Sequence, residues 1–112
     1  MLAITLTIVA ETQQYKLGAY MPKIVLSGFI LVPEEELENI KQALQIHTDL
    51  TRAEAGCLRF DVTQNTQQPL RFDVYEEFAD KASFDRHQQR VKTSVWGQVT
   101  VNVTRHYQIC EV

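Results

Sequence analysis

Hydrophobic and polar residues alternate along two neighbouring stretches in the middle of the chain, residues 58–63 and 71–78. A period of two is typical of a β-strand with one buried and one solvated face. The polar segment between them, NTQQP at residues 65–69, supplies turn chemistry. The pattern therefore predicts an antiparallel hairpin. Its inward side chains are expected to be Leu58, Phe60 and Val62 on the first strand and Phe72, Val74, Glu76 and Phe78 on the second.

Glu76 is the exception on the apolar face of the second strand. It shares the register of Phe72 and Val74, so its carboxyl group is predicted to point into the core. A buried carboxyl group needs a hydrogen-bond partner, an opposite charge or a proton. Glu76 is therefore a candidate catalytic base, and a structural hydrogen-bonding role explains it equally well.

Apolar residues at three-and-four spacing predict two helices. The first runs from about Glu34 to Arg52, and the second begins after Asp80, a good N-cap. The expected buried faces are Leu37, Ile40, Leu44 and His47 on the first helix and Phe84, His87 and Val91 on the second. Each face contains one histidine. Because histidine titrates near neutral pH, His47 and His87 are candidate bases, the alternative being core histidines bonded to backbone carbonyls.

The strand KIVLSGFILV precedes the first helix, and after Trp96 and Gly97 the β-branched run TVNVT leads into a final strand, RHYQICEV. The order strand, helix, strand, strand, helix, strand is typical of the ferredoxin-like α+β fold, with both helices on one face of a four-stranded antiparallel sheet. Both faces of the first strand carry large apolar side chains, which favours a homodimer packed sheet to sheet. His106 and Tyr107 alternate on the last strand, so at most one of them points into any one pocket.

Residues 1–20 precede this domain, which we expect to span residues 21–112. Met21 and Pro22 form a plausible alternative start, directly before the first strand of the domain. The segment 1–20 is therefore predicted to be an N-terminal extension or leader that adds a strand or a packed arm, without evident chemistry of its own.

Composition excludes several classes of protein. At 112 residues and 45% hydrophobic, the chain is expected to form one domain. A net charge of −3 with scattered basic residues argues against nucleic-acid binding, and no apolar run is long enough to span a membrane. Cys57 and Cys110 are far apart, and no His or Cys spacing typical of metal ligands occurs. We therefore expect a cytoplasmic protein with reduced thiols and no metal site.

The segments TRAEAGCLRFDV and PLRFDVYEEFADKASFDRH make the chain resemble the antibiotic biosynthesis monooxygenase family. Members of that family carry an E-P-G-C-L-R-[FY] turn and strand, a strand ending in YEE[FW], and a helix with a histidine a few residues after an aromatic residue. The resemblance covers roughly residues 23–112. It departs at Ala55, where the family usually has proline, so the turn is expected to be less rigid.

The resemblance implies a homodimer in which two sheets form an α+β barrel, with an apolar pocket between each sheet and its helices. Cofactor-free members oxygenate electron-rich phenols, anthrones or hydroquinones with dioxygen. This chemistry needs a base, a donor for the developing oxyanion and an aromatic wall. The candidate residues are His47, His87 and Glu76 for the base, Tyr75, His106 and Arg105 for the donor, and Phe60, Phe72, Phe84 and Trp96 for the wall. Tyr75 lies on the opposite strand face in the predicted register, which also suits a dimer interface.

Other functions occur on the same fold and remain open. Haem-degrading relatives surround the porphyrin with an asparagine, a tryptophan and a histidine, but here the early helix offers only Asn39 among glutamates. We therefore expect no cofactor. The alternatives to an oxygenase are a non-catalytic dimeric module for small-molecule binding or stress response, and an isomerase that uses the same base without oxygen.

Overall fold

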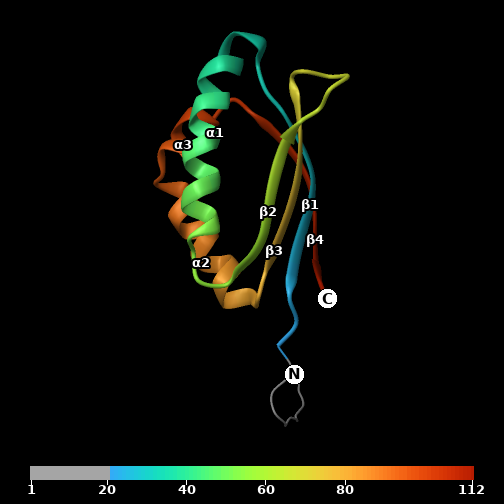
Figure 1. Cartoon of the computed structure of the whole chain (residues 1–112), viewed down its shortest axis with the longest axis vertical. Helices are drawn as coiled ribbons and strands as arrows, with labels where there is room; N and C mark the ends of the chain where they lie inside the picture. Colours follow the sequence, from blue (N-terminus) through green and yellow to red (C-terminus); the bar gives the residue numbers. More distant parts are fainter. Residues whose placement is uncertain (1–20) are drawn as a thin grey trace.

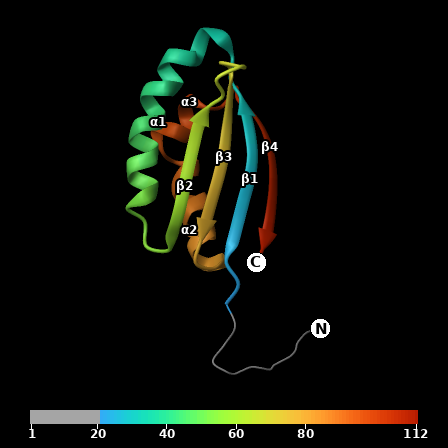
Figure 2. The same cartoon turned by 45° about the vertical axis from the view of Figure 1, so that its right-hand side comes forward.

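The structure is a computed structural model that describes residues 21–112, so the extension predicted for residues 1–20 lies outside the described residues. One four-stranded sheet carries all of the helices on a single face (Figures 1 and 2). The elements in chain order are β1 (Ile24–Leu31), η2 (Glu34–Glu36), α1 (Leu37–Arg52), β2 (Cys57–Gln64), β3 (Arg71–Phe78), α2 (Lys81–Lys92), α3 (Val95–Val99) and β4 (Thr104–Glu111).

The sheet has the strand order β2-β3-β1-β4, and each neighbouring pair is antiparallel. This is the ferredoxin-like α+β topology that the sequence predicted. β3 and β1 are the central strands, and β2 and β4 form the two edges (Figure 2). Residues from three different strands can therefore meet the same helix face.

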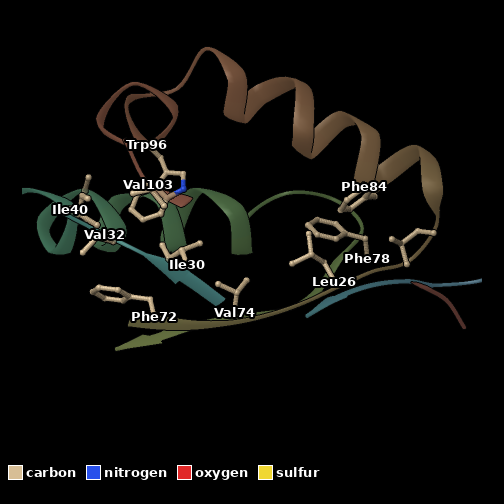
Figure 3. Packing of buried hydrophobic residues seen from close by; sticks show 12 residues of the cluster. Leu26, Ile30, Val32, Ile40, Phe72, Val74, Phe78, Phe84, Trp96 and Val103 are labelled. Atoms are coloured by element: carbon tan, nitrogen blue, oxygen red, sulfur yellow. The ribbon is translucent and has the colours of Figure 1, made fainter. Parts of the chain in front are cut away.

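The core lies between the sheet and the helices and has aromatic residues at both ends (Figure 3). At one end, Phe72 lies near Val32 and Ile40. At the other, Phe84 from α2 packs against Phe78 from β3, with ring centroids 5.7 Å apart. Burial of these side chains provides the main stabilisation of the fold.

The hairpin is confirmed, with one difference in register. β3 alternates as predicted, and Glu76 is only 6% exposed. In β2 the pairing shifts, because Cys57 opposes Phe78 whereas Arg59 opposes Glu77. The extra residue at this β-bulge, Leu58, is 55% exposed, so the prediction that it faces inward is wrong. Cys57 takes the partly buried position opposite Phe78 instead.

The predicted helices are confirmed, and both of their histidines are buried. His47 is 5% exposed and His87 is 3% exposed. Asp80 caps α2, since its carboxylate accepts a hydrogen bond of 2.8 Å from the Ser83 backbone N–H. The glutamates expected to open the first helix form the 3₁₀ turn η2, and α1 itself begins at Leu37.

The sequence did not predict the short helix α3, which contains Trp96 and Gly97. Ser94 caps it by accepting a hydrogen bond from the Gly97 N–H at 3.0 Å, and the Thr100 hydroxyl donates to the Trp96 carbonyl at 2.6 Å. These side-chain bonds favour a helical turn over the strand that the β-branched residues suggest. The final strand, β4, begins at Thr104, one residue before the predicted run RHYQICEV.

The sheet face away from the helices carries aromatic and charged side chains. Phe29 stacks on His106 at 4.6 Å between ring centroids, and the Arg71 guanidinium lies 3.9 Å from the Phe29 ring centroid. On the same face, the Tyr75 hydroxyl donates to Glu77 at 2.6 Å. We refer to the sheet surface formed by these five residues as the outer face. Among residues 21–112, no helix has the length and apolar character needed to cross a membrane.

Candidate functional site

A pocket of about 360 Å³ opens between the sheet and the three α-helices. It brings together His47 from α1, Glu76 from β3 and His87 from α2, the three residues that the sequence singled out as candidate bases. The remaining lining residues are Leu26, Gln88, Val91, Lys92, Trp96, Gly97, Arg105 and Tyr107. The pocket therefore combines titratable groups with an apolar wall, as binding and catalytic sites commonly do.

His87 has different neighbours at its two ring nitrogens. Its Nδ1 lies 2.8 Å from Oε1 of Glu54, whose other oxygen accepts a bond from Arg90. Glu54 is also ion-paired with Arg90, and a carboxylate oxygen accepts hydrogen bonds, so this contact favours a proton on Nδ1. The other ring nitrogen, Nε2, lies 3.8 Å from Oε1 of Glu76. Burial lowers the pKa of His87, although the bond to Glu54 acts in the opposite direction.

Glu76 is a buried carboxyl group whose Oε1 has no hydrogen-bond partner among the described residues. Burial and, to a smaller extent, the charge of Glu54 raise its pKa to about 7. Near neutral pH the carboxyl group is therefore present in both protonation states. A carboxylate with such a pKa is a competent base or acid at physiological pH.

His47 lies flat against Trp96, with ring centroids 4.9 Å apart and an interplanar angle of 4°. The Phe60 ring meets it edge-on at 5.3 Å. Its Nδ1 is buried and has no hydrogen-bond partner within residues 21–112. Burial, together with the positive charges that surround it, lowers the pKa of His47 to about 3. The ring is thus neutral at pH 7 and suits hydrogen bonding to a ligand better than accepting a proton.

Trp96 is the one predicted wall residue that lines this pocket. Phe60 contacts both histidine rings from β2, at 5.3 Å from His47 and 6.1 Å from His87 between centroids. Phe72 and Phe84 belong to the hydrophobic core, and neither lines the pocket.

The predicted donors are divided between the two sides of the sheet. Tyr75 and His106 lie on the outer face, away from the three candidate bases. Arg105 lines the pocket, and its guanidinium is held by a 2.8 Å bond to the Thr100 hydroxyl. Tyr107, which alternates with His106, is the β4 aromatic residue that lines the pocket.

Glu54 and Arg90 were not among the site residues predicted from the sequence. Glu54 lies in the turn after α1, and Arg90 lies one helical turn beyond His87 on α2. Glu54 lies two residues before Gly56, where the family pattern E-P-G-C-L-R-[FY] has its glutamate. This match was the one sequence signal that pointed to Glu54 as a site residue. Its contact with His87 joins residues 33 apart in sequence, so spacing alone gives no indication of it.

A second, more apolar pocket of about 380 Å³ shares His47 and Trp96 with the first. Its other lining residues include Ala43, Ile46 and Leu50 on α1 and Val95 on α3. The stacked rings of His47 and Trp96 therefore border both pockets.

Neither cysteine takes part in the site. Cys57 and Cys110 are free thiols, and Cys110 is exposed because it lies on the edge strand β4. Over the described range, no three His, Cys, Asp or Glu side chains are grouped so that they could hold a metal ion.

The fold and the pocket define a small ferredoxin-like α+β domain with two histidines and a carboxyl group between its sheet and its helices. The family model described as antibiotic biosynthesis monooxygenase matches residues 24–96. The chain belongs to this family, and the resemblance stated from the sequence is confirmed. No curated protein matches the chain.

Solved structures show the same fold. A protein from Nitrosomonas europaea, provisionally named an antibiotic biosynthesis monooxygenase, is 20% identical with a TM-score of 0.69, and the match covers 86% of this chain and 93% of that one. A protein from Shewanella oneidensis is 26% identical, with a TM-score of 0.61 and coverage of 83% and 91%. A dimeric ferredoxin-like protein from an uncultured marine organism is 17% identical, with a TM-score of 0.62 and coverage of 81% and 95%.

Proposed function

We propose that this protein is a homodimeric, cofactor-independent monooxygenase that oxidises an aromatic, quinol or anthrone-like small molecule with dioxygen. The observation that carries the proposal is the convergence of His47, Glu76 and His87 on one pocket that Trp96 lines. Membership of the antibiotic biosynthesis monooxygenase family supports it.

Such a reaction takes all of its electrons from the substrate. Deprotonation gives a phenolate or carbanion that reduces dioxygen. For an anthrone methylene group, two C–H bonds break, a C=O bond forms with one oxygen atom, and the other oxygen leaves as water. For a hydroquinone, one oxygen atom enters the ring and the other leaves as water, which gives a hydroxyquinone. The protein must supply a base, charge stabilisation and shielding from solvent.

The residues of the pocket match these needs. Nε2 of His87 accepts the substrate proton, and the neighbouring Glu76 exchanges that proton because its pKa lies near 7. The Arg105 guanidinium stabilises the developing oxyanion. His47 offers a neutral ring nitrogen to a substrate hydroxyl group, and Trp96 supplies an aromatic wall.

The outer face is the proposed dimer interface. It presents Phe29 and Tyr75 on the two central strands, and Leu31 on β1 is 38% exposed. Aromatic and apolar groups on an uncovered sheet face favour association with a second copy. The dimeric relative with the same fold is consistent with this arrangement.

Oxygen uptake with a panel of hydroquinones and anthrones tests the proposed reaction. We expect uptake with at least one compound, and a loss of roughly a hundredfold or more in His87→Ala, the amount that general base catalysis contributes. Glu38→Ala is the control, because it removes a titratable side chain that is exposed on α1, away from both the pocket and the outer face. Absence of uptake above buffer with every compound contradicts the proposal. Turnover under argon indicates an isomerase instead, and binding without turnover indicates a binding module.

A further inference from the structure

We infer that Glu54 is a positioning residue that holds His87 with its proton on Nδ1, which leaves Nε2 free to take a proton from the substrate. That the proton comes from a substrate rests on the proposed function. The orientation of the ring itself rests only on contacts within the chain.

The first observation is the chain of contacts behind His87. Glu54 lies 2.8 Å from Nδ1 through one carboxylate oxygen, and its other oxygen accepts a bond from the Arg90 side chain. Arg90 in turn donates to the Thr51 hydroxyl at 3.0 Å. Thr51 is fully buried, so this chain of contacts ends in rigid core. Both oxygens of Glu54 thus have partners, and its orientation is fixed from two sides.

The second observation is how the turn brings Glu54 to α2. The Glu54 backbone N–H donates to the Thr51 carbonyl at 3.0 Å, and its carbonyl accepts from Cys57 at 3.2 Å. Gly56 has φ +90°, and a Cβ there would lie 2.1 Å from Oγ of Ser83 on α2. Only glycine permits this close approach at this φ. The turn after α1 is therefore pressed against α2, within reach of His87.

The third observation is the asymmetry of the His87 surroundings. The charged and titratable groups around the ring are Glu54 from the turn, Glu76 from β3, His47 from α1 and Arg90 from α2 itself. Glu54 is the group at hydrogen-bond distance from the ring, whereas Glu76 lies 3.8 Å away and lines the pocket. A carboxylate behind the ring fixes the tautomer and stabilises the imidazolium that forms when Nε2 accepts a proton.

A purely structural ion pair between Glu54 and Arg90 is the competing interpretation. It predicts that loss of the Glu54 charge alters stability but leaves the protonation of His87 unchanged. The readout must therefore report on the ring nitrogens themselves.

The experiment is NMR of protein carrying isotope-labelled histidine, with the His87 signals assigned by their loss in His87→Gln. We expect wild-type His87 to carry its proton on Nδ1. In Glu54→Gln we expect titration of His87 at lower pH, because the amide keeps the shape of the side chain but loses its charge. Glu38→Gln, which removes an exposed carboxylate from α1, is the matched control and should leave His87 unchanged.

A wild-type proton on Nε2, or the same titration of His87 in Glu54→Gln and wild type, overturns the inference. Where a substrate is found, kcat in Glu54→Gln should fall by about tenfold to a hundredfold, the loss seen for residues that orient a metal-bound histidine, while Glu38→Gln retains activity. Absence of oxygen uptake with every substrate refutes the oxygenase but leaves the NMR result to decide the role of Glu54.

Discussion

Nε2 of His87 and Oε1 of Glu76 face each other at 3.8 Å in the pocket, and both side chains are buried. If neither atom carried a proton, two lone pairs would face each other across this distance. A proton on either atom relieves that repulsion, so the protonation of each group affects the other. Glu76 thus has a pKa that suits a base near neutral pH, and both residues line the pocket, where a substrate can reach them.

The buried carboxyl group of Glu76 should make the protein less stable as the pH rises. Its pKa is about 7 in the folded state and 4.5 without the fold. The group is neutral in both states below about 4.5, whereas above 7 the folded state holds a buried charge. The free energy of unfolding should therefore fall between these pH values by on the order of 3 kcal/mol. Urea denaturation from pH 5 to 8 should show that Glu76→Gln removes this loss.

Glu77→Gln is the control for that prediction, because Glu77 lies on the outer face and its pKa is lowered by the Tyr75 hydroxyl. It should leave the loss at rising pH in place. An identical pH dependence in wild type and Glu76→Gln would contradict the raised pKa.

The lowered pKa of His47 should make the protein less stable as the pH falls, the opposite of the dependence expected from Glu76. Its pKa is about 3 in the folded state and 6.5 without the fold, so unfolding favours proton uptake. The stabilisation that the neutral ring contributes is complete above 6.5 and is lost as the pH falls towards 3. The difference amounts to on the order of 5 kcal/mol at the acid end. His47→Phe, which keeps a ring against Trp96, should reduce this loss in denaturation curves, whereas His106→Phe should not.

Replacement of Trp96 should affect both stability and binding. The side chain is 8% exposed and stacks on His47, so Trp96→Ala should cost about 3–5 kcal/mol of unfolding free energy. Trp96→Phe should retain part of the wall and raise KM less than alanine does. The neighbouring Val95 is 61% exposed, and Val95→Ala should change stability by less than about 0.5 kcal/mol. Equal KM values for both Trp96 variants would argue against a wall role.

The turn before β2 should not tolerate a side chain at Gly56. Alanine there must adopt φ +90° and collide with Ser83, so Gly56→Ala should destabilise the protein by about 1–3 kcal/mol in thermal or urea unfolding. The double variant Gly56→Ala with Ser83→Gly relieves the collision but not the backbone strain. It should recover only part of the loss, and full recovery would show that the positive φ carries no cost.

A charge on the outer face should prevent association. Phe29 lies at its centre between His106 and Arg71. We expect wild type to sediment as a dimer and Phe29→Glu as a monomer, because a buried unpaired carboxylate opposes the interface. Leu50→Glu, on the opposite side at a residue 50% exposed, is the control and should remain dimeric. A monomeric wild type, or a dimeric Phe29→Glu, would contradict the proposed interface.

The local elements of this protein follow from its sequence because each depends on a short pattern. Alternation placed Glu76 inward, three-and-four spacing placed His47 and His87 on buried helix faces, and Asp80 marked the start of α2. Two local features were not predicted, namely the β-bulge that exposes Leu58 and the Ser94 cap that begins α3.

The pocket depends on contacts that no local pattern contains. Alternation shows that Glu76 faces inward, but the crossing of α1 and α2 over the sheet decides that it meets His87 and lies in the same pocket as His47. The same packing buries Phe72 and Phe84 in the core and brings Glu54 to Nδ1 of His87. The sequence by itself determined most of the residues that lie inside, since burial follows from periodicity except where a bulge such as that at Leu58 interrupts it. Only the tertiary structure decided which of them meet, because their distances depend on how distant elements pack.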